Sequence, residues 1–124
     1  MLHMCAVASG ADVNGGVFGH AALHHCCTNG HPDMAAYLAG EGGADFNMRD
    51  VVGETPFYHA CRDGQLSCAQ VLAGVEGCDL TTPHNDGTSP LEIAKRKGRQ
   101  EVVTWLEPII NSGVTKGGAA VARM

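Results

Sequence analysis

The stretch GETPFYHACRDGQ, residues 53–65, occurs in three related versions along the chain. GHAALHHCCTNGH covers residues 19–31 and GTSPLEIAKRKGR covers residues 87–99, so the three stretches start 34 residues apart in both steps. Each stretch begins with a glycine and carries a second glycine near its end. A column of leucines further along keeps the same spacing, at Leu38, Leu72 and Leu106. Several columns sharing one period indicate an internal repeat that organises the whole fold.

Each repeat contains two predicted helices. Thr55 and Ser89 both precede a proline, and a Thr or Ser cap followed by proline is typical of a helix start. The second glycine of each stretch favours a helix end, because glycine tolerates the left-handed conformation found there. A second helix is expected over residues 32–39, 66–73 and 101–110. One unit cannot bury its apolar face alone, so neighbouring units must stack.

Composition limits the class of protein. The 124 residues suffice for one domain, and 44% of them are hydrophobic but only 5% aromatic, which predicts a core of small aliphatic side chains. The formal charge of −5 argues against nucleic acid as the main partner. No apolar run is long enough for a membrane span, and the first residues lack the basic region of a signal peptide. The six cysteines form no CxxC motif, so we expect reduced thiols and a cytoplasmic location.

The unit resembles the ankyrin repeat, whose signature is T-P-L-H-x-A. The matching segments are TPFYHA at 55–60, SPLEIA at 89–94 and AALHHC at 21–26, and GADVN at 10–14 and GADFN at 43–47 resemble the family's repeat ends. The resemblance implies an all-α ankyrin-repeat solenoid of stacked helix–turn–helix units with β-turn tips. The chain departs from this signature at Tyr58 and Glu92, which stand where the signature has histidine. Among the three segments only the first has the histidine, at His24.

The resemblance predicts one array over residues 1–110. We expect a partial repeat over 1–15, repeats over 16–49 and 50–83, a polar terminal repeat over 84–110, and a disordered tail over 111–124. Because the partial repeat reads as a second helix without its first, the chain is expected to be a truncated product or part of a longer array.

The first stretch packs four histidines and two cysteines into 13 residues, which raises the question of a zinc site. His20, His24, Cys27 and His31 are spaced 4, 3 and 4 residues apart and would share one face of a continuous helix. However, a helix from Ala22 to Gly30 leaves the first and last of these histidines in turns. All six cysteines align with positions of small or apolar core residues, where cysteine packs as a hydrophobe. We therefore favour packing and expect no metal and no cofactor, and we expect buried thiols to have raised pKa values and low reactivity.

Catalytic motifs do not stand out in the sequence. GxSxG, HExxH, P-loop and paired-carboxylate patterns are not found. Cys61 and His59 are two residues apart, so on a helix they point about 200° apart and cannot form a local dyad. We therefore expect no catalytic residues and no enzymatic activity.

The resemblance implies that a partner binds the turn tips and the ends of the first helices, which line a concave surface. Carried over to this chain, the candidate contact residues are Phe18, His20, Val51, Val52, Glu54, Arg62, Asp63, Asn85, Asp86 and Arg96. Phe18, Val51 and Val52 are expected at the centre of the contact, because apolar residues at solvent-facing tips suit a binding patch. The competing interpretation is that the two valines only pack on the adjacent tip.

The favoured function is a non-catalytic protein–protein interaction module that binds a protein or peptide, and neither nucleic acid nor a membrane. We expect a monomer, with a dimer through the N-terminal side as the alternative. Two other functions stay open at this point. One is a regulatory ankyrin fragment of a larger enzyme or channel, and the other is a small metal-binding or redox-responsive protein built on His24 and Cys27.

Overall fold

The fold is known from a computed structural model of the chain, which describes residues 22–42 and 44–118. These residues form six helices, in the order α2 (Ala22–Asn29), α3 (Pro32–Ala39), α4 (Pro56–Arg62), α5 (Leu66–Ala73), α6 (Pro90–Arg96) and α7 (Gln100–Asn111). Within the described ranges there is no β-strand, only an isolated antiparallel bridge between Asp79 and Lys116. No helix in this part of the chain has both the length and the apolar character needed to cross a membrane. The expected all-α class is confirmed.

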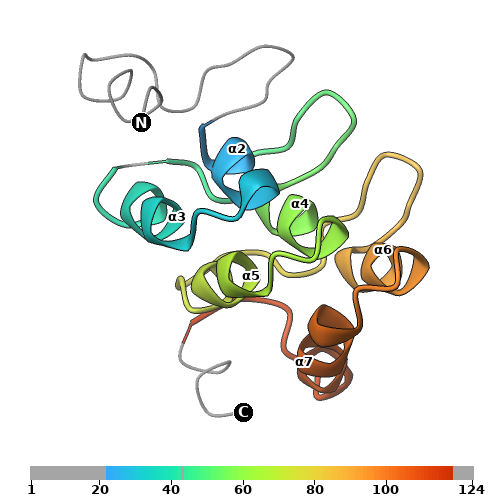
Figure 1. Ribbon diagram of the computed structural model, residues 1–124. Coiled ribbons are helices and arrows are strands. Elements are labelled where there is room, and N and C mark those ends of the chain that lie inside the picture. Colours follow the sequence, from blue (N-terminus) through green and yellow to red (C-terminus); the bar gives the residue numbers. More distant parts are fainter. Residues whose placement is uncertain (1–21, 43, 119–124) are drawn as a thin grey trace.

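The helices lie in two rows (Figure 1). The first helices of the three units, α2, α4 and α6, pack against one another in sequence, and the second helices α3, α5 and α7 form the other row. The long loops between α3 and α4 and between α5 and α6 extend on the side of the first row (Figure 1). The predicted stack of helix–turn–helix units is confirmed.

The helix boundaries follow the caps that the sequence predicts. Thr55 Oγ1 accepts a hydrogen bond of 3.1 Å from the Tyr58 backbone N–H at the start of α4. Ser89 and Glu92 form a reciprocal capping box at the start of α6. The first helices end before Gly30, Gly64 and Gly98, which have φ values of 76°, 70° and 70°. These are left-handed conformations in which a side chain would be strained.

The core is made of the columns that repeat in the sequence. Leu38, Leu72 and Leu106 are all at most 1% exposed. Five cysteines lie in the described residues and all are buried and free, as their alignment with core positions predicts, namely Cys26, Cys27, Cys61, Cys68 and Cys78. Cys5 lies outside the described residues.

Equivalent hydrogen bonds join successive units. The Gln65 side chain donates from Nε2 to the Thr28 carbonyl at 3.1 Å. One unit later, Arg99 donates from Nε to the Arg62 carbonyl at 2.9 Å. The donors are 34 residues apart, and so are the acceptors. The units that contain Gln65 and Arg99 thus fix the end of the preceding first helix by the same kind of contact.

The C-terminal segment differs from the expectation of disorder beginning at residue 111. Helix α7 includes Asn111, and the following residues pair with the link between α5 and α6. Leu80 N–H donates to the Thr115 carbonyl at 2.9 Å, and Gly117 N–H donates to the Cys78 carbonyl at 2.7 Å. These backbone bonds were not foreseen, because nothing local in this glycine-rich segment marks its partner. Residues 119–124, and the partial repeat expected over 1–15, lie outside the described residues.

Candidate partner-binding site

The tip between α3 and α4 is a tight turn built by Asp50. Its backbone N–H donates to the Glu54 carbonyl at 3.0 Å, and its carbonyl accepts from Gly53 N–H at 2.9 Å. The carboxylate oxygen Oδ1 accepts from the backbone N–H groups of Val52 at 3.1 Å and Glu54 at 2.9 Å. These bonds hold the turn, and the side chains of Val51 and Val52 face solvent. Their exposed fractions are 63% and 40%.

The next tip is attached to the first. Asn85 N–H donates to the Val52 carbonyl at 2.9 Å, and Asn85 Nδ2 donates to the Val51 carbonyl at 3.3 Å. Arg49 Nη2 donates to the Pro83 carbonyl at 3.0 Å. The two valines therefore contact the adjacent tip through their backbone, while their apolar side chains stay available. Two tips held in one arrangement form a preorganised surface, which lowers the entropic cost of binding.

A buried polar network lies behind the tips. Glu54 Oε1 accepts from Arg62 Nη1 at 2.7 Å and lies 3.3 Å from His59 Nε2, and Glu54 Oε2 lies 3.3 Å from His84 Nε2. The Glu54 side chain is only 8% exposed. Burial raises the pKa of Glu54, and the positive charge of Arg62 offsets this only in part. Glu54 is therefore an internal residue that a partner cannot contact directly, which corrects its expected place on the exposed tip.

His59 connects this network to the preceding unit. Its Nε2 lies 3.0 Å from Asp50 Oδ2, and its Nδ1 lies 2.8 Å from Thr28 Oγ1 and 3.2 Å from Arg62 Nη2. Because arginine can only donate, Nδ1 accepts and Nε2 carries the proton toward the carboxylate. The order Asp50, His59, Thr28 matches the connectivity of a hydrolase triad. The guanidinium beside Nδ1 opposes proton transfer from Thr28 to that nitrogen, and the contacts of His59 join the two units.

The charged residues at the ends of the first helices form an equivalent pair of contacts. Arg62 reaches Glu54, and Arg96, which lies 34 residues later, donates from Nη1 to Thr88 Oγ1 at 3.2 Å. Arg62 also pairs with Asp63 at 3.0 Å, and these two side chains are 27% and 25% exposed. Arg62 and Asp63 therefore offer a partner only part of their side-chain surface, whereas the side chain of Arg96 is exposed.

The structure thus separates the predicted contact residues into groups. The exposed ones are Val51, Val52, Asn85, Asp86 and Arg96, and they lie on two adjoining tips and the end of α6. Arg62 and Asp63 are half-buried, and Glu54 is buried. Phe18 and His20 lie outside the described residues, so their place at the first tip stays a prediction.

The histidines and cysteines of the first stretch that lie in the described part of the chain, residues 22–31, form no group of potential metal ligands with one another. His24 is buried and its Nε2 donates to the Glu54 carbonyl at 2.9 Å, which is the tie between turns expected for the signature histidine. Burial lowers the pKa of His24. Cys27 is buried in the core, and His31 is exposed.

A different set of potential ligands does come together. His24, Asp50 and His59 place one ligand atom each within 4.8 Å of the others. Their polar atoms already make the hydrogen bonds described above, with Nε2 of His24 on a carbonyl and both nitrogens of His59 engaged. A metal would have to displace these bonds, so the arrangement is explained by the protein's own contacts.

Sequence reasoning missed Asp50, Thr28 and His59 as the residues that shape the tip. Asp50 precedes a turn that closes at Gly53, and such an aspartate is a recognisable local signal for a side-chain-to-backbone turn. The contact between Thr28 and His59 spans 31 residues, and no spacing rule reveals it.

Comparison with known proteins agrees with this geometry. A family model described as ankyrin repeats, in three copies, matches residues 42–114, which is more than half of the chain. A second model, described as an ankyrin repeat, matches residues 18–51. No curated protein matches the chain.

Proposed function

The chain belongs to the ankyrin-repeat family, whose members are generally protein–protein interaction modules, and from that premise we propose that it binds a protein or peptide without catalysing a reaction. The contact surface is formed by the two adjoining tips and the exposed ends of the first helices. The observation that carries the proposal is the exposure of Val51 and Val52 on a turn that hydrogen bonds to Asp50 hold in shape.

The chemistry of this surface fits a partner with an apolar patch and a polar border. Exposed valines supply the desolvated centre that contacts of this kind need. Asn85, Asp86 and Arg96 surround them with polar and charged groups of both signs, which orient a partner more than they add affinity. Because Asn85 and Arg49 hold the tips together, little order has to be gained on binding.

The test compares capture of proteins by three versions of the chain. The Val51→Ser/Val52→Ser variant removes the apolar patch, and Tyr37→Ser is the matched control, because Tyr37 is a 47% exposed hydrophobic residue on α3 in the other row. All three versions are expected to keep equal helicity, since exposed substitutions change stability by only about 0.5 kcal/mol.

We expect proteins that are held by the wild type and by Tyr37→Ser but lost by the double variant. The dissociation constant of each such protein, remeasured with purified components, should rise by about tenfold or more, as for a contact centre. Equal retention by the double variant would overturn the assigned surface.

A further inference from the structure

A basic cluster lies at the end of α6 and in the turn that leads to α7. It consists of Arg96, Lys97 and Arg99, and all three residues are exposed. Together with Lys95 they make up four of the eight lysines and arginines of a chain whose formal charge is −5. Positive charge is thus concentrated at one place on a negatively charged protein.

The hydrogen bonds of the basic cluster go to neutral groups. Arg96 donates from Nη1 to Thr88 Oγ1 at 3.2 Å, and Arg99 donates from Nε to the Arg62 carbonyl at 2.9 Å. The Lys97 side chain makes no hydrogen bond or ion pair with the residues that the structure describes. The bond from Nε fixes the Arg99 guanidinium and leaves its two terminal nitrogens facing away from the Arg62 carbonyl.

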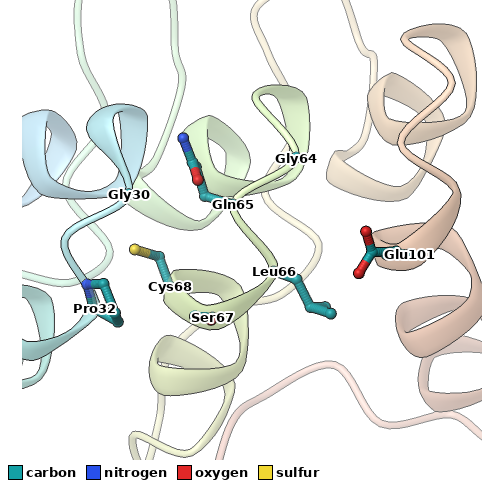
Figure 2. Close-up of a pocket in the computed structure, with 8 residues that line it drawn as sticks. All are labelled: Gly30, Pro32, Gly64, Gln65, Leu66, Ser67, Cys68 and Glu101. Carbon is teal, nitrogen blue, oxygen red and sulfur yellow. The ribbon is translucent and has the colours of Figure 1, made fainter.

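Nearby carboxylates have contacts of their own. Glu107 Oε2 lies 2.6 Å from Lys95 Nζ, and Asp63 is paired with the arginine that precedes it. Asp86 accepts a backbone hydrogen bond within its own turn. Figure 2 shows the Glu101 carboxylate directed toward the start of α5. Within the described ranges no carboxylate forms an ion pair with the basic cluster, so its charges are left for a group outside the chain.

The stack of units does not require these charges. Gln65 makes the same bond to a preceding first helix that Arg99 makes one unit later. Figure 2 shows the Gln65 side chain reaching toward Gly30 at the end of α2. The position equivalent to Lys97 two units earlier holds Asn29, which is also uncharged. Neutral side chains therefore serve the structural role at both positions.

Helix electrostatics accounts for Lys97 but not for Arg99. A positive side chain is favourable at a helix C-terminus, and Lys97 is the C-cap of α6. Arg99 is the N-cap of α7 and makes no side-chain cap bond there, so its charge lies at the helix end that disfavours it. Arg99 also reaches back to the preceding unit, so it does not belong to the polar outer face of a terminal repeat. Its charge has no stabilising role within the described part of the chain.

We propose that the basic cluster binds an acidic segment of the protein partner, with carboxylates of that segment on Lys97 and Arg99. A guanidinium that is already held at Nε can present its terminal nitrogens to one carboxylate, and lysine supplies a point charge beside it. Arg96 contacts Thr88 on the loop between α5 and α6, and it therefore continues the positive surface toward the tips. The chain is negative elsewhere, so it repels a long phosphate backbone more than a short acidic segment.

This inference rests on the proposed function, because it names the chemistry of the same partner. The exposed valines of the tip supply an apolar centre, and the basic cluster supplies an ionic contact at the end of the stack. Its test uses a synthetic peptide and no captured protein, so the two proposals can fail separately.

The experiment titrates octaglutamate into the full, isotopically labelled chain and follows the backbone amides by nuclear magnetic resonance. At a salt concentration of about 0.05 M, where charges are weakly screened, we expect the largest shifts at residues 96–100 and none with octaglutamine. Raising the salt to about 0.5 M should remove the shifts. Shifts confined to other residues, or an equal response to octaglutamine, would overturn the proposal. Tighter binding of a single-stranded oligonucleotide of eight nucleotides at the same residues would overturn the choice of an acidic protein segment.

A double variant built from the chain's own repeats removes the charge and keeps the fold. Lys97→Asn/Arg99→Gln introduces the residue types already present at equivalent positions, and it should remain as helical as the wild type. The dissociation constant of octaglutamate should rise by about threefold or more, because exposed ion pairs are individually weak. Lys95→Gln/Lys116→Gln is the matched control, since it removes two lysine charges that are paired with carboxylates. Equal weakening by both variants would mean that only net charge matters, which would overturn the site.

The valine variant separates this inference from the proposed function. Val51→Ser/Val52→Ser should bind octaglutamate as the wild type does, because the basic cluster is intact. Failure of octaglutamate to bind the wild type would overturn the basic site alone. Equal protein capture by the valine variant would overturn the tip surface alone.

Discussion

Replacing Asp50 tests the account of how the tip is built. Its Oδ1 accepts two backbone N–H groups, from Val52 and Glu54, and its Oδ2 faces the protonated Nε2 of His59 at 3.0 Å. The carboxylate is 7% exposed. A hydrogen bond to a charged group contributes about 1.5–3 kcal/mol, and three bonds to one group are not additive. Asp50→Ala is therefore expected to lower the free energy of unfolding by about 2–4 kcal/mol.

Asp50→Asn separates the contribution of the two backbone hydrogen bonds from that of the contact with His59. The amide oxygen can still accept the two backbone N–H groups, but the amide nitrogen then faces the N–H of His59, where two donors meet. We expect the asparagine variant to lose about 1–2 kcal/mol, less than the alanine variant. Glu41→Ala, which removes an exposed carboxylate elsewhere, is the control and should change stability by no more than about 0.5 kcal/mol.

The assay is urea unfolding followed by circular dichroism. Burial alone would raise the pKa of Asp50, but the hydrogen bonds from the Glu54 backbone and from His59 outweigh it and leave the pKa below the ordinary value. A carboxylate with a lowered pKa contributes stability that is complete above its unfolded pKa of about 3.9 and is lost as pH falls through the folded value. The difference between wild type and Asp50→Ala should thus persist at neutral pH and narrow below about pH 4, with sulfate added to keep both chains folded.

Two results would refute this reasoning. An alanine variant as stable as the wild type at pH 7 would mean that Asp50 does not hold the turn. A loss that is the same at pH 3.5 as at pH 7, with both chains folded, would mean that the charge of the carboxylate is not what the two N–H groups and His59 require.

Three further substitutions test the helix ends by the same urea assay. Ser89→Ala removes the capping box of α6 and should cost about 1 kcal/mol, whereas Ser67→Ala, at an exposed position in α5, should cost little, and equal losses would contradict the cap. Gly64→Ala and Gly98→Ala both force a side chain into a φ of 70° and should each cost about 1–2 kcal/mol. The loss at Gly64 should be the larger, because its new Cβ would lie 2.9 Å from Arg99 Cδ whereas Gly98 has open space, and the reverse order would be inconsistent with that contact.

Local signals in the sequence were enough to predict the scaffold. The caps Thr55 and Ser89 and the glycines that end each first helix act within a few residues, so their pattern is visible in the chain. The leucine columns are visible because every unit buries the same face against its neighbours. In a repeat protein most contacts join a unit to its nearest neighbours. For this reason the 34-residue period was enough to predict that the units stack.

The details of the site depend on contacts between units and were therefore hidden. Glu54 was placed on the exposed tip by its position in the repeat, yet Arg62 and His84, eight and thirty residues away, draw it inside. Alignment of units shows which residues are equivalent but not which side chains meet across an interface.

Two units lack the histidine of the family signature, and their residues at that position make other contacts. His24 ties the first described unit to the next turn through the Glu54 carbonyl. Tyr58, at the equivalent position one unit later, is buried and packs its ring 5.9 Å from that of His84, on the following turn. Glu92, at the third equivalent position, has no following unit among the described residues to reach, and its carboxylate instead accepts from the Ser89 backbone within its own cap. At His24 and Tyr58 the position contacts the next unit, by a hydrogen bond or by ring packing, whereas Glu92 contacts its own cap because no described unit follows it.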